Sequence, residues 1–373
     1  MIWDNMKDRS LVFILICLLT ISSIQPAYLA TGQQPTEKQV LDYVILYDES
    51  HGQYFNRSLM QTALDSLSNI TVQDPEVEIR INVLYQENGT EFNSTNLQGI
   101  DLLLITNPGI GDENAFTSSE REAVLDYVEL GGSLFLLCNP LTQDENITGH
   151  TEAFTNLLST RNNLLTSARF SSSPDQIRSQ VIIDDFNSTY ANDSFITINE
   201  YNVTKNILTS QIDYFWQELE IDNVTIYSTP ISLGSERADD DDNGVELAKT
   251  PSTSYSVDED YTIYRDTVNG FLTWLLSKEL GDSRLVLSGS TIMFSDSTIS
   301  ENSTWIEENQ NLDLWNNLVL WLLKYTPHPV RDPPAIWVFE NYALVVAALS
   351  VAIFGISVLI YKYRSKKRTS IKI

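Results

Sequence analysis

Three residues that follow the first apolar run carry groups suited to acid–base chemistry. Asp48, Ser50 and His51 supply a carboxylate, a hydroxyl and an imidazole directly after the run 42–47. Such groups transfer protons only when they converge on one reacting atom, and neighbours on a loop point in different directions. No partner elsewhere in the chain can be assigned. We therefore interpret this stretch as an exposed loop or helix start and keep Asp48 and His51 as ligand or interface candidates.

Cys138 is the only cysteine outside the apolar leader, which holds Cys17. It ends a predicted strand at 133–138, where a nucleophile would be well placed. The flanking Leu136-Leu-Cys-Asn-Pro140 lacks the glycines of a nucleophile elbow, which favours a buried structural thiol. No disulfide can form within the mature ectodomain, so the fold depends on its core.

The acidic loop before Gly244 matches half of a calcium loop, because Asp239, Asp241 and Asn243 occupy alternate positions. The twelfth position, where a bidentate glutamate belongs, is Thr250. We interpret the loop as solvated and expect no cofactor; a metal site on these three residues is the alternative.

The segment 284–297 combines an apolar strand pattern with a small-residue turn at Ser288-Gly-Ser290. None of the chain's three histidines is near it in sequence, so a base for an attacking serine is missing. We interpret the segment as a core strand with a structural turn. Ser288, Ser290 and Asp296 stay as ligand or interface candidates.

The elements that would position these residues alternate in type along the first part of the chain. Two helices are predicted, one at 54–67 and one that Ser118 or Ser119 caps and Gly131-Gly132 closes. Strands are predicted at 42–47, 77–85, 100–105 and 133–138. Continuous apolar strands of this kind predict an α/β fold with a parallel sheet covered on both faces. The loops 48–51, 107–111 and 139–144 would then gather beyond the carboxyl ends of the strands.

The second part of the ectodomain is less regular. We predict an α/β half at 38–160 and a second α/β part at 161–325. The second part has strands at 181–183, 224–227 and within 284–297, and a helix at 312–325. A stiff, proline-rich linker follows at 326–337.

Two apolar segments predict the membrane topology. Residues 1–30 have the layout of a signal peptide, and an uncleaved anchor is the alternative. Residues 338–361 contain twenty consecutive uncharged positions, enough to cross the bilayer, and the tail 362–373 is basic. The positive-inside rule places the tail in the cytosol. A type I protein is expected, its ectodomain extracellular in a prokaryote or in the endoplasmic-reticulum lumen of a eukaryote.

Glycosylation sequons and acidity agree with an exterior location. The formal net charge of −27 argues against nucleic acid as a partner, because phosphates would be repelled. Ten Asn-x-Ser/Thr sequons lie between the two apolar segments, at Asn56, Asn69, Asn88, Asn93, Asn146, Asn187, Asn192, Asn202, Asn223 and Asn302.

Three stretches, 250–256, 284–297 and 314–329, precede the terminal span in an order that resembles one family. They are similar to the large non-catalytic subunit of eukaryotic oligosaccharyltransferase, the wheat-germ-agglutinin-binding-protein type. The resemblance implies a leader, a flavodoxin-like luminal domain, one C-terminal span and no catalysis. It also makes Ser254 and Tyr255, of the Thr-Ser-Tyr motif, interface candidates. The partners it implies are the catalytic oligosaccharyltransferase subunit, other membrane subunits and the lipid bilayer.

The N-terminal part resembles a wider amidotransferase-like group that includes an intraflagellar-transport domain. The similarity lies in Asp48-Glu-Ser-His-Gly52 and Gly131-Gly-Ser133. Members of that group have commonly lost catalytic residues, which agrees with Cys138 lacking an elbow.

The chain departs from the oligosaccharyltransferase family in two places. The family has a β-sandwich between the α/β domain and the membrane, whereas only the proline linker stands here. The tail has Ser370 and Ile371 where a retrieval signal needs lysines. A minimal or prokaryotic version is therefore expected.

The sequence is compatible with three functions. The first is a stabilising subunit of a membrane oligosaccharyltransferase complex, which takes part in protein N-glycosylation. The alternative is a sugar- or ligand-binding module attached to a transporter, using the sheet end near His51 and Asp296. The third is a hydrolase or amidotransferase built on Cys138. We rank them in this order.

Overall fold

The computed structural model describes residues 38–70, 72, 76–159, 168–172, 177–190, 192–199, 221, 223–233, 244–260, 262–264 and 271–325. The predicted leader, linker, membrane span and tail lie outside these residues, as do Asn202 and the acidic loop 239–243. The chain divides into two compact units, and the smaller contains, of the described residues, 38–40 and 76–78. Apart from the first two residues of each of the strands at 39–48 and 77–86, all that follows concerns the larger unit.

A seven-stranded sheet is the centre of the fold, in the order β11-β14-β15-β4-β3-β1-β2. The neighbours β1, β3, β4 and β15 run parallel, whereas β14 runs antiparallel to both β15 and β11. Their bounds are β1 Gln39–Asp48, β2 Val77–Gln86, β3 Leu102–Thr106, β4 Ser133–Leu137, β11 Val245–Lys249, β14 Thr273–Leu280 and β15 Ser283–Ser288. The predicted α/β class is confirmed, but the sheet is mixed rather than purely parallel. Both predicted α/β parts, 38–160 and 161–325, contribute strands to it.

The antiparallel edge has a local cause. Leu280 pairs with Ser283, so only Gly281 and Asp282 connect β14 to β15. Two residues cannot make the crossover that parallel strands need, and Gly281 adopts the positive φ of 60° that such a hairpin turn requires. The strand pattern alone does not reveal this turn.

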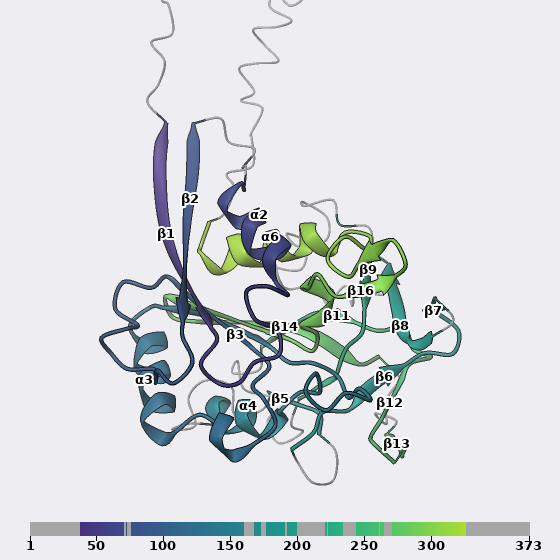
Figure 1. Ribbon diagram of the computed structural model, residues 1–373. Coiled ribbons are helices and arrows are strands. Elements are labelled where there is room, and N and C mark those ends of the chain that lie inside the picture. Colours follow the sequence, from purple (N-terminus) through teal and green to yellow (C-terminus); the bar gives the residue numbers. More distant parts are fainter. Residues whose placement is uncertain are drawn as a thin grey trace, which may run out of the picture. The chain divides into compact units, whose positions relative to one another are not determined.

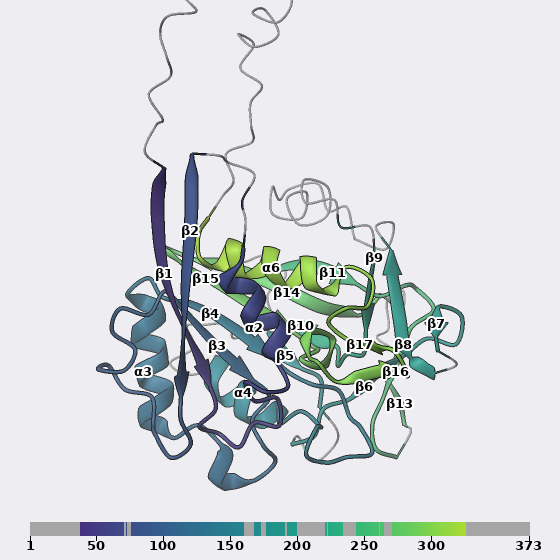
Figure 2. The same cartoon turned by 45° about the horizontal axis from the view of Figure 1, so that its top comes forward.

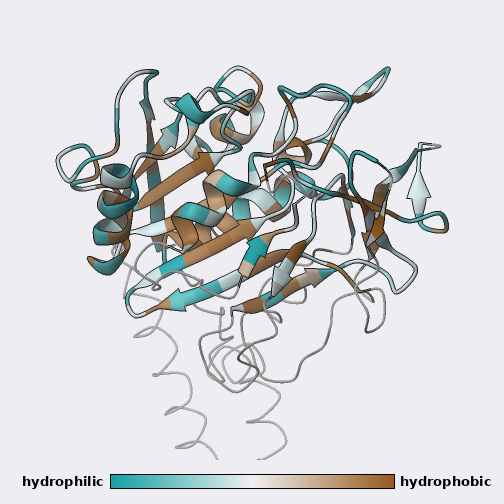
Figure 3. Cartoon of the chain, turned by 90° about the horizontal axis from the view of Figure 1, so that it is seen from below, coloured by the Kyte–Doolittle hydropathy of each residue, from teal (hydrophilic) through white to brown (hydrophobic). Residues whose placement is uncertain are grey.

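Side chains of the central strands alternate between two apolar layers. Figures 1 and 2 show helices on both sides of the sheet. From β3, Leu102 and Leu104 join the cluster of α2 (Gln61–Ser68) and α6 (Asn311–Leu322). Leu103 and Ile105 join the other cluster, with α3 (Ser118–Glu129) and α4 (Thr151–Leu158). Burial on both faces explains why the strands are apolar throughout rather than alternating (Figure 3).

Smaller elements lie beside the main sheet. They are β5 Ala168–Phe170 with β10 Ile231–Leu233; β6 Val181–Ile183 with β12 Tyr255–Val257 and β13 Ile263–Tyr264; β7 Ser188–Thr189 with β8 Asn192–Asn199 and β9 Asn223–Ile226; β16 Thr298–Ser300 with β17 Ser303–Thr304; and the 3-10 turns η1 Asp112–Asn114 and η5 Ile292–Phe294. The strands predicted at 181–183 and 224–227 are confirmed as β6 and β9.

Both predicted helix starts of the first part need correction. The helix expected from residue 54 begins at Gln61, because Asn56 Oδ1 accepts from Ser58 N (2.9 Å) and holds a turn there. The helix α3 is capped by Thr117, not by Ser118 or Ser119. Its capping box pairs Glu120 N with Thr117 Oγ1 (3.3 Å) and Thr117 N with Glu120 Oε2 (2.9 Å).

Candidate functional site

The carboxyl ends of the central strands gather the three loops that the sequence predicts there. Gly109 N donates to His51 O (2.9 Å), which joins the loops after β3 and β1. His150 N donates to Asn107 Oδ1 (2.9 Å), which joins the loop after β4 to the same place. This edge is where an α/β protein usually holds its ligand, so its polar groups decide whether it can.

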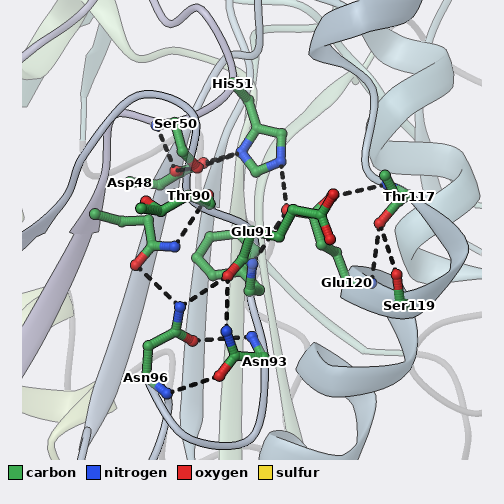
Figure 4. A network of polar contacts seen from close by, with 12 residues as sticks. Asp48, Ser50, His51, Thr90, Glu91, Asn93, Asn96, Thr117, Ser119 and Glu120 are labelled. Carbon is green, nitrogen blue, oxygen red and sulfur yellow. Dashed lines mark hydrogen bonds and ion pairs between the residues drawn. The ribbon is translucent and has the colours of Figure 1, made fainter.

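His51 is enclosed between two carboxylates (Figure 4). Its Nδ1 lies 2.8 Å from Asp48 Oδ2, and its Nε2 lies 3.1 Å from Glu120 Oε1. Asp48 also accepts from Ser50 Oγ (2.6 Å) and from the Gln53 amide. We call these five residues the His51 cluster. The side chains of the central three are almost fully buried.

Two aromatic rings pack against the imidazole. Phe116 lies 4.4 Å and Phe92 5.4 Å from His51 between ring centroids. Glu120 Oε1 also accepts from Phe92 N (3.1 Å), which ties the loop after β2 to the start of α3. The cluster therefore joins three segments distant in sequence.

Charge complementarity within the cluster outweighs the cost of burial. Burial lowers the pKa of His51, but hydrogen bonds and attraction from Asp48 and Glu120 raise it to about 9 overall. Burial raises the pKa of Glu120, but the bonds from His51 and from the backbone of Thr117 and Phe92 lower it to about 2. His51 is therefore an imidazolium at neutral pH, bonded at both nitrogens.

This geometry does not match a catalytic triad, and it leaves His51 unsuited to act as a general base. A catalytic triad has the serine on one ring nitrogen and the carboxylate on the other. Here Ser50 Oγ (3.0 Å) and Asp48 both face Nδ1, and Glu120 takes Nε2. A charged histidine cannot accept a proton. The arrangement holds the loops together. The sequence did not predict Glu120 as a partner of His51, and its only sequence signal is its position in the capping box of α3.

Cys138 follows β4 and is fully buried. Burial strongly raises the pKa of its thiol, since a thiolate would lose its hydration there. The thiol lies so close to Gly149 that a Cβ at that glycine would stand 2.5 Å from Sγ. The expectation of a buried thiol is confirmed.

We expect Cys138 to stay unmodified when the native protein is treated with a small alkylating reagent at pH 8. The measurement is the intact mass before and after denaturation, with addition at Cys138 only after denaturation. Rapid alkylation of the native protein would contradict the assignment of Cys138 as a buried, unreactive thiol. It would favour the hydrolase or amidotransferase alternative.

The other polar side chains of this edge bind the chain's own backbone. Asn107 Nδ2 donates to Thr148 O (3.0 Å) and Asn139 Nδ2 to Ile147 O (2.7 Å). Asn139 Oδ1 accepts from Ile292 N (3.1 Å). The loops are thus braced against one another by amides that a ligand would otherwise use.

Ser288 ends β15, Ser290 lies in the turn that follows it, and Asp296 comes after η5. Both serines are fully buried: Ser288 Oγ donates to Ser290 O (2.9 Å), and Ser290 Oγ accepts from Met293 N (3.3 Å). Asp296 Oδ2 accepts from Thr62 N (3.0 Å) and so caps α2 from far along the chain. These contacts support the interpretation of 284–297 as a core strand and structural turn. No hydrogen bond among the described residues joins Asp296 to the His51 cluster.

Ser254 and Tyr255 lie in a separate place, against two acids that follow β6. Ser254 Oγ and Thr253 Oγ1 each donate to Asp184 Oδ2 (2.7 Å), and Tyr255 OH donates to Asp185 Oδ1 (3.2 Å). Burial raises the pKa of Asp184, but these hydroxyls and nearby backbone amides lower it overall. The sequence signal for this site is the pair of acids, Asp184 and Asp185, that follows the predicted strand 181–183. The Thr-Ser-Tyr motif alone does not indicate the site.

Metal sites and membrane-spanning helices can be assessed only for the described residues. No group of three His, Cys, Asp or Glu side chains among the described residues is arranged to hold a metal ion. Thr250, the twelfth position of the calcium-like loop, is buried and accepts from Leu272 N (3.0 Å). Across those same ranges, no helix combines the length and apolarity that crossing a bilayer requires. Nine sequon asparagines are described, and all are exposed except Asn223, which is half-buried.

Comparisons with known proteins identify no family. No protein-family model matches the chain, and no curated protein matches it. Solved structures that it resembles include a cytoplasmic protein from Salmonella typhimurium (11% identity, TM-score 0.35, covering 75% of this chain and 98% of that chain). Others are a putative GMP synthase subunit from Thermoplasma acidophilum (10%, 0.34, 76% and 94%) and the glutaminase domain of a Trypanosoma brucei CTPS (10%, 0.35, 76% and 96%). Likenesses at these TM-scores carry no argument about this chain's chemistry.

Proposed function

We propose that this chain is a non-catalytic, structural subunit of a membrane oligosaccharyltransferase complex. The proposal that the chain is non-catalytic rests on the polar groups at the carboxyl edge of the sheet. Its imidazolium, its thiol and its two amides are buried and bonded within the chain, so no nucleophile or base is presented there. The choice of complex rests on the sequence resemblance of 250–256, 284–297 and 314–329.

The ligand-binding alternative has less support from the contacts. It places a sugar between His51 and Asp296, but His51 is enclosed by carboxylates and rings, and Asp296 caps α2. Neither side chain is offered to a ligand. A scaffold uses buried networks of this kind for rigidity rather than for binding.

The proposal is tested by affinity purification of the tagged full-length chain from its own membranes in mild detergent, followed by mass spectrometry. A catalytic oligosaccharyltransferase subunit should copurify in near-stoichiometric amount. Its absence at low salt and in two detergents would overturn the proposal.

Matched variants test whether the predicted span makes the contact. Small residues let transmembrane helices approach closely, so Ala348→Leu with Ala352→Leu should reduce copurification several-fold. Val346→Leu with Val358→Leu adds one methylene at each of two positions that are already large and should not. Equal recovery from both pairs would exclude these small residues as the contact.

A further inference from the structure

Two aromatic side chains are exposed on one short turn between β6 and β8. Phe186 is 80% exposed and Tyr190 is 44% exposed. They lie on residues 184–190, which we call the 184–190 turn and which include the short strand β7 (Figure 1). Large aromatic side chains that are both exposed and fixed in place are typical anchors of protein interfaces.

The backbone under Phe186 is held by a buried carboxylate. Asp184 Oδ1 accepts from Phe186 N (2.9 Å) and Asn187 N (3.0 Å), while its Oδ2 accepts from Thr253 and Ser254. The Thr-Ser-Tyr motif thus holds the turn in one conformation. A pre-ordered anchor loses less conformational entropy when a partner binds.

Tyr190 is held in a conformation that a tyrosine rarely adopts. Its φ of 55° lies in the left-handed region, which costs free energy for a residue with a Cβ. Its hydroxyl donates to Glu308 Oε2 (2.7 Å), a contact from 118 residues away. The strain is compensated by contacts that keep the ring partly in solvent.

The surface around the two rings is strongly negative. No Lys or Arg occurs in 179–204, 250–264 or 285–323. Contacts bring these three stretches together, through Tyr255 to Asp185 and through Tyr190 to Glu308. Asp185, Asp193 and Glu307 are exposed. An apolar anchor with exposed acids beside it is complementary to an apolar pocket bordered by Lys and Arg.

We propose that the 184–190 turn is a docking surface for a positively charged partner protein, with Phe186 as the anchor and Asp185 and Asp193 as the charged rim. A small cation would leave Phe186 without a role, and an anionic lipid surface or a nucleic acid would be repelled. The surface does not depend on which complex the chain belongs to.

The sequon at Asn187 gives this proposal an independent consequence. Its Nδ2 donates to Asp184 (3.2 Å) and to Thr253 Oγ1 (3.1 Å), so the atom that would carry a glycan is part of the support of the turn. A glycan next to Phe186 would also cover the anchor. Peptide mapping of the natural protein should find Asn187 unmodified.

The direct experiment places a photocrosslinking benzophenone amino acid at position 186 of the full-length chain in its own membranes. The matched control carries it at position 130, where Leu130 is 89% exposed on a different part of the chain. We expect position 186 to give one main adduct, whose crosslinked peptide is apolar and flanked by Lys or Arg. Its yield should fall at least fivefold in Asp185→Asn with Asp193→Asn. A similar fall is expected between about 0.05 M and about 0.5 M salt, where screening shortens the range of these charges.

The outcomes separate this proposal from the proposed function. An adduct with a catalytic oligosaccharyltransferase subunit supports both, and an adduct with another basic protein keeps the surface but removes that function. The same adducts at 186 and 130, a yield insensitive to salt and to the two acids, or a glycan at Asn187 would overturn the docking surface. Asp185→Asn with Asp193→Asn should leave the unfolding midpoint unchanged, which shows that lost crosslinking is not lost folding.

Discussion

Replacing His51 with leucine is expected to lower the free energy of unfolding by about 3–5 kcal/mol, because it leaves two carboxylates buried without their shared cation. Both are enclosed: Asp48 is fully buried and Glu120 is 2% exposed. The measurement is denaturant unfolding of the full-length chain in detergent, followed by tryptophan fluorescence. His51→Gln, which keeps one donor, should recover part of the loss. Ser50→Ala removes a single donor to Asp48 and should cost about 1 kcal/mol.

The stabilisation by His51 is expected to depend on pH at both ends. The pKa of His51 rises from 6.5 to about 9 on folding, so its contribution is complete below 6.5 and is lost as the pH rises through 9. The pKa of Glu120 falls from 4.5 to about 2, so its contribution is complete above 4.5 and is lost as the pH falls through 2. The stability difference between the natural chain and His51→Leu should therefore be largest between about pH 4.5 and 6.5. A difference that is the same from pH 3 to 10 would contradict the charged assignment.

Asn311→Asp is expected to lower the free energy of unfolding by more than about 3 kcal/mol, since it replaces a fully used amide by a buried charge. Asn311 Nδ2 donates to the carbonyls of Thr225 (3.0 Å), Met293 (3.2 Å) and Trp305 (2.9 Å). Three carbonyls would then face a carboxylate oxygen. The side chain connects α6, β9 and η5, so the loss should appear in global unfolding.

The matched control for this prediction is Asn317→Asp on the same helix. Asn317 is half-buried rather than fully buried, so the carboxylate that the substitution introduces can stay hydrated. It should change stability by less than about 1 kcal/mol. Equal effects at 311 and 317 would show that helix charge, not the buried network, sets the cost.

Continuous apolar runs predicted the central strands well. The strands expected at 42–47, 100–105 and 133–138 are β1, β3 and β4, because burial on both sheet faces demands apolar residues at every position. The gathering of their loops also followed, since parallel strands end at one edge. Helix starts were predicted less well, because apolar spacing does not reveal the local turn at Asn56 or the Thr117 capping box, and because the cap from Asp296 comes from far along the chain.

The composition and order of residues by themselves determined the α/β class, the positions of the main strands and the acidity of the chain. These properties follow from local periodicity and from counting charges. Only the tertiary structure decided what His51 and the Thr-Ser-Tyr motif do. Glu120 lies 69 residues from His51, and Ser254 lies 70 residues from Asp184. A side chain's pKa and its availability depend on such distant partners, so residues that suggested chemistry in sequence are instead bonded within the fold.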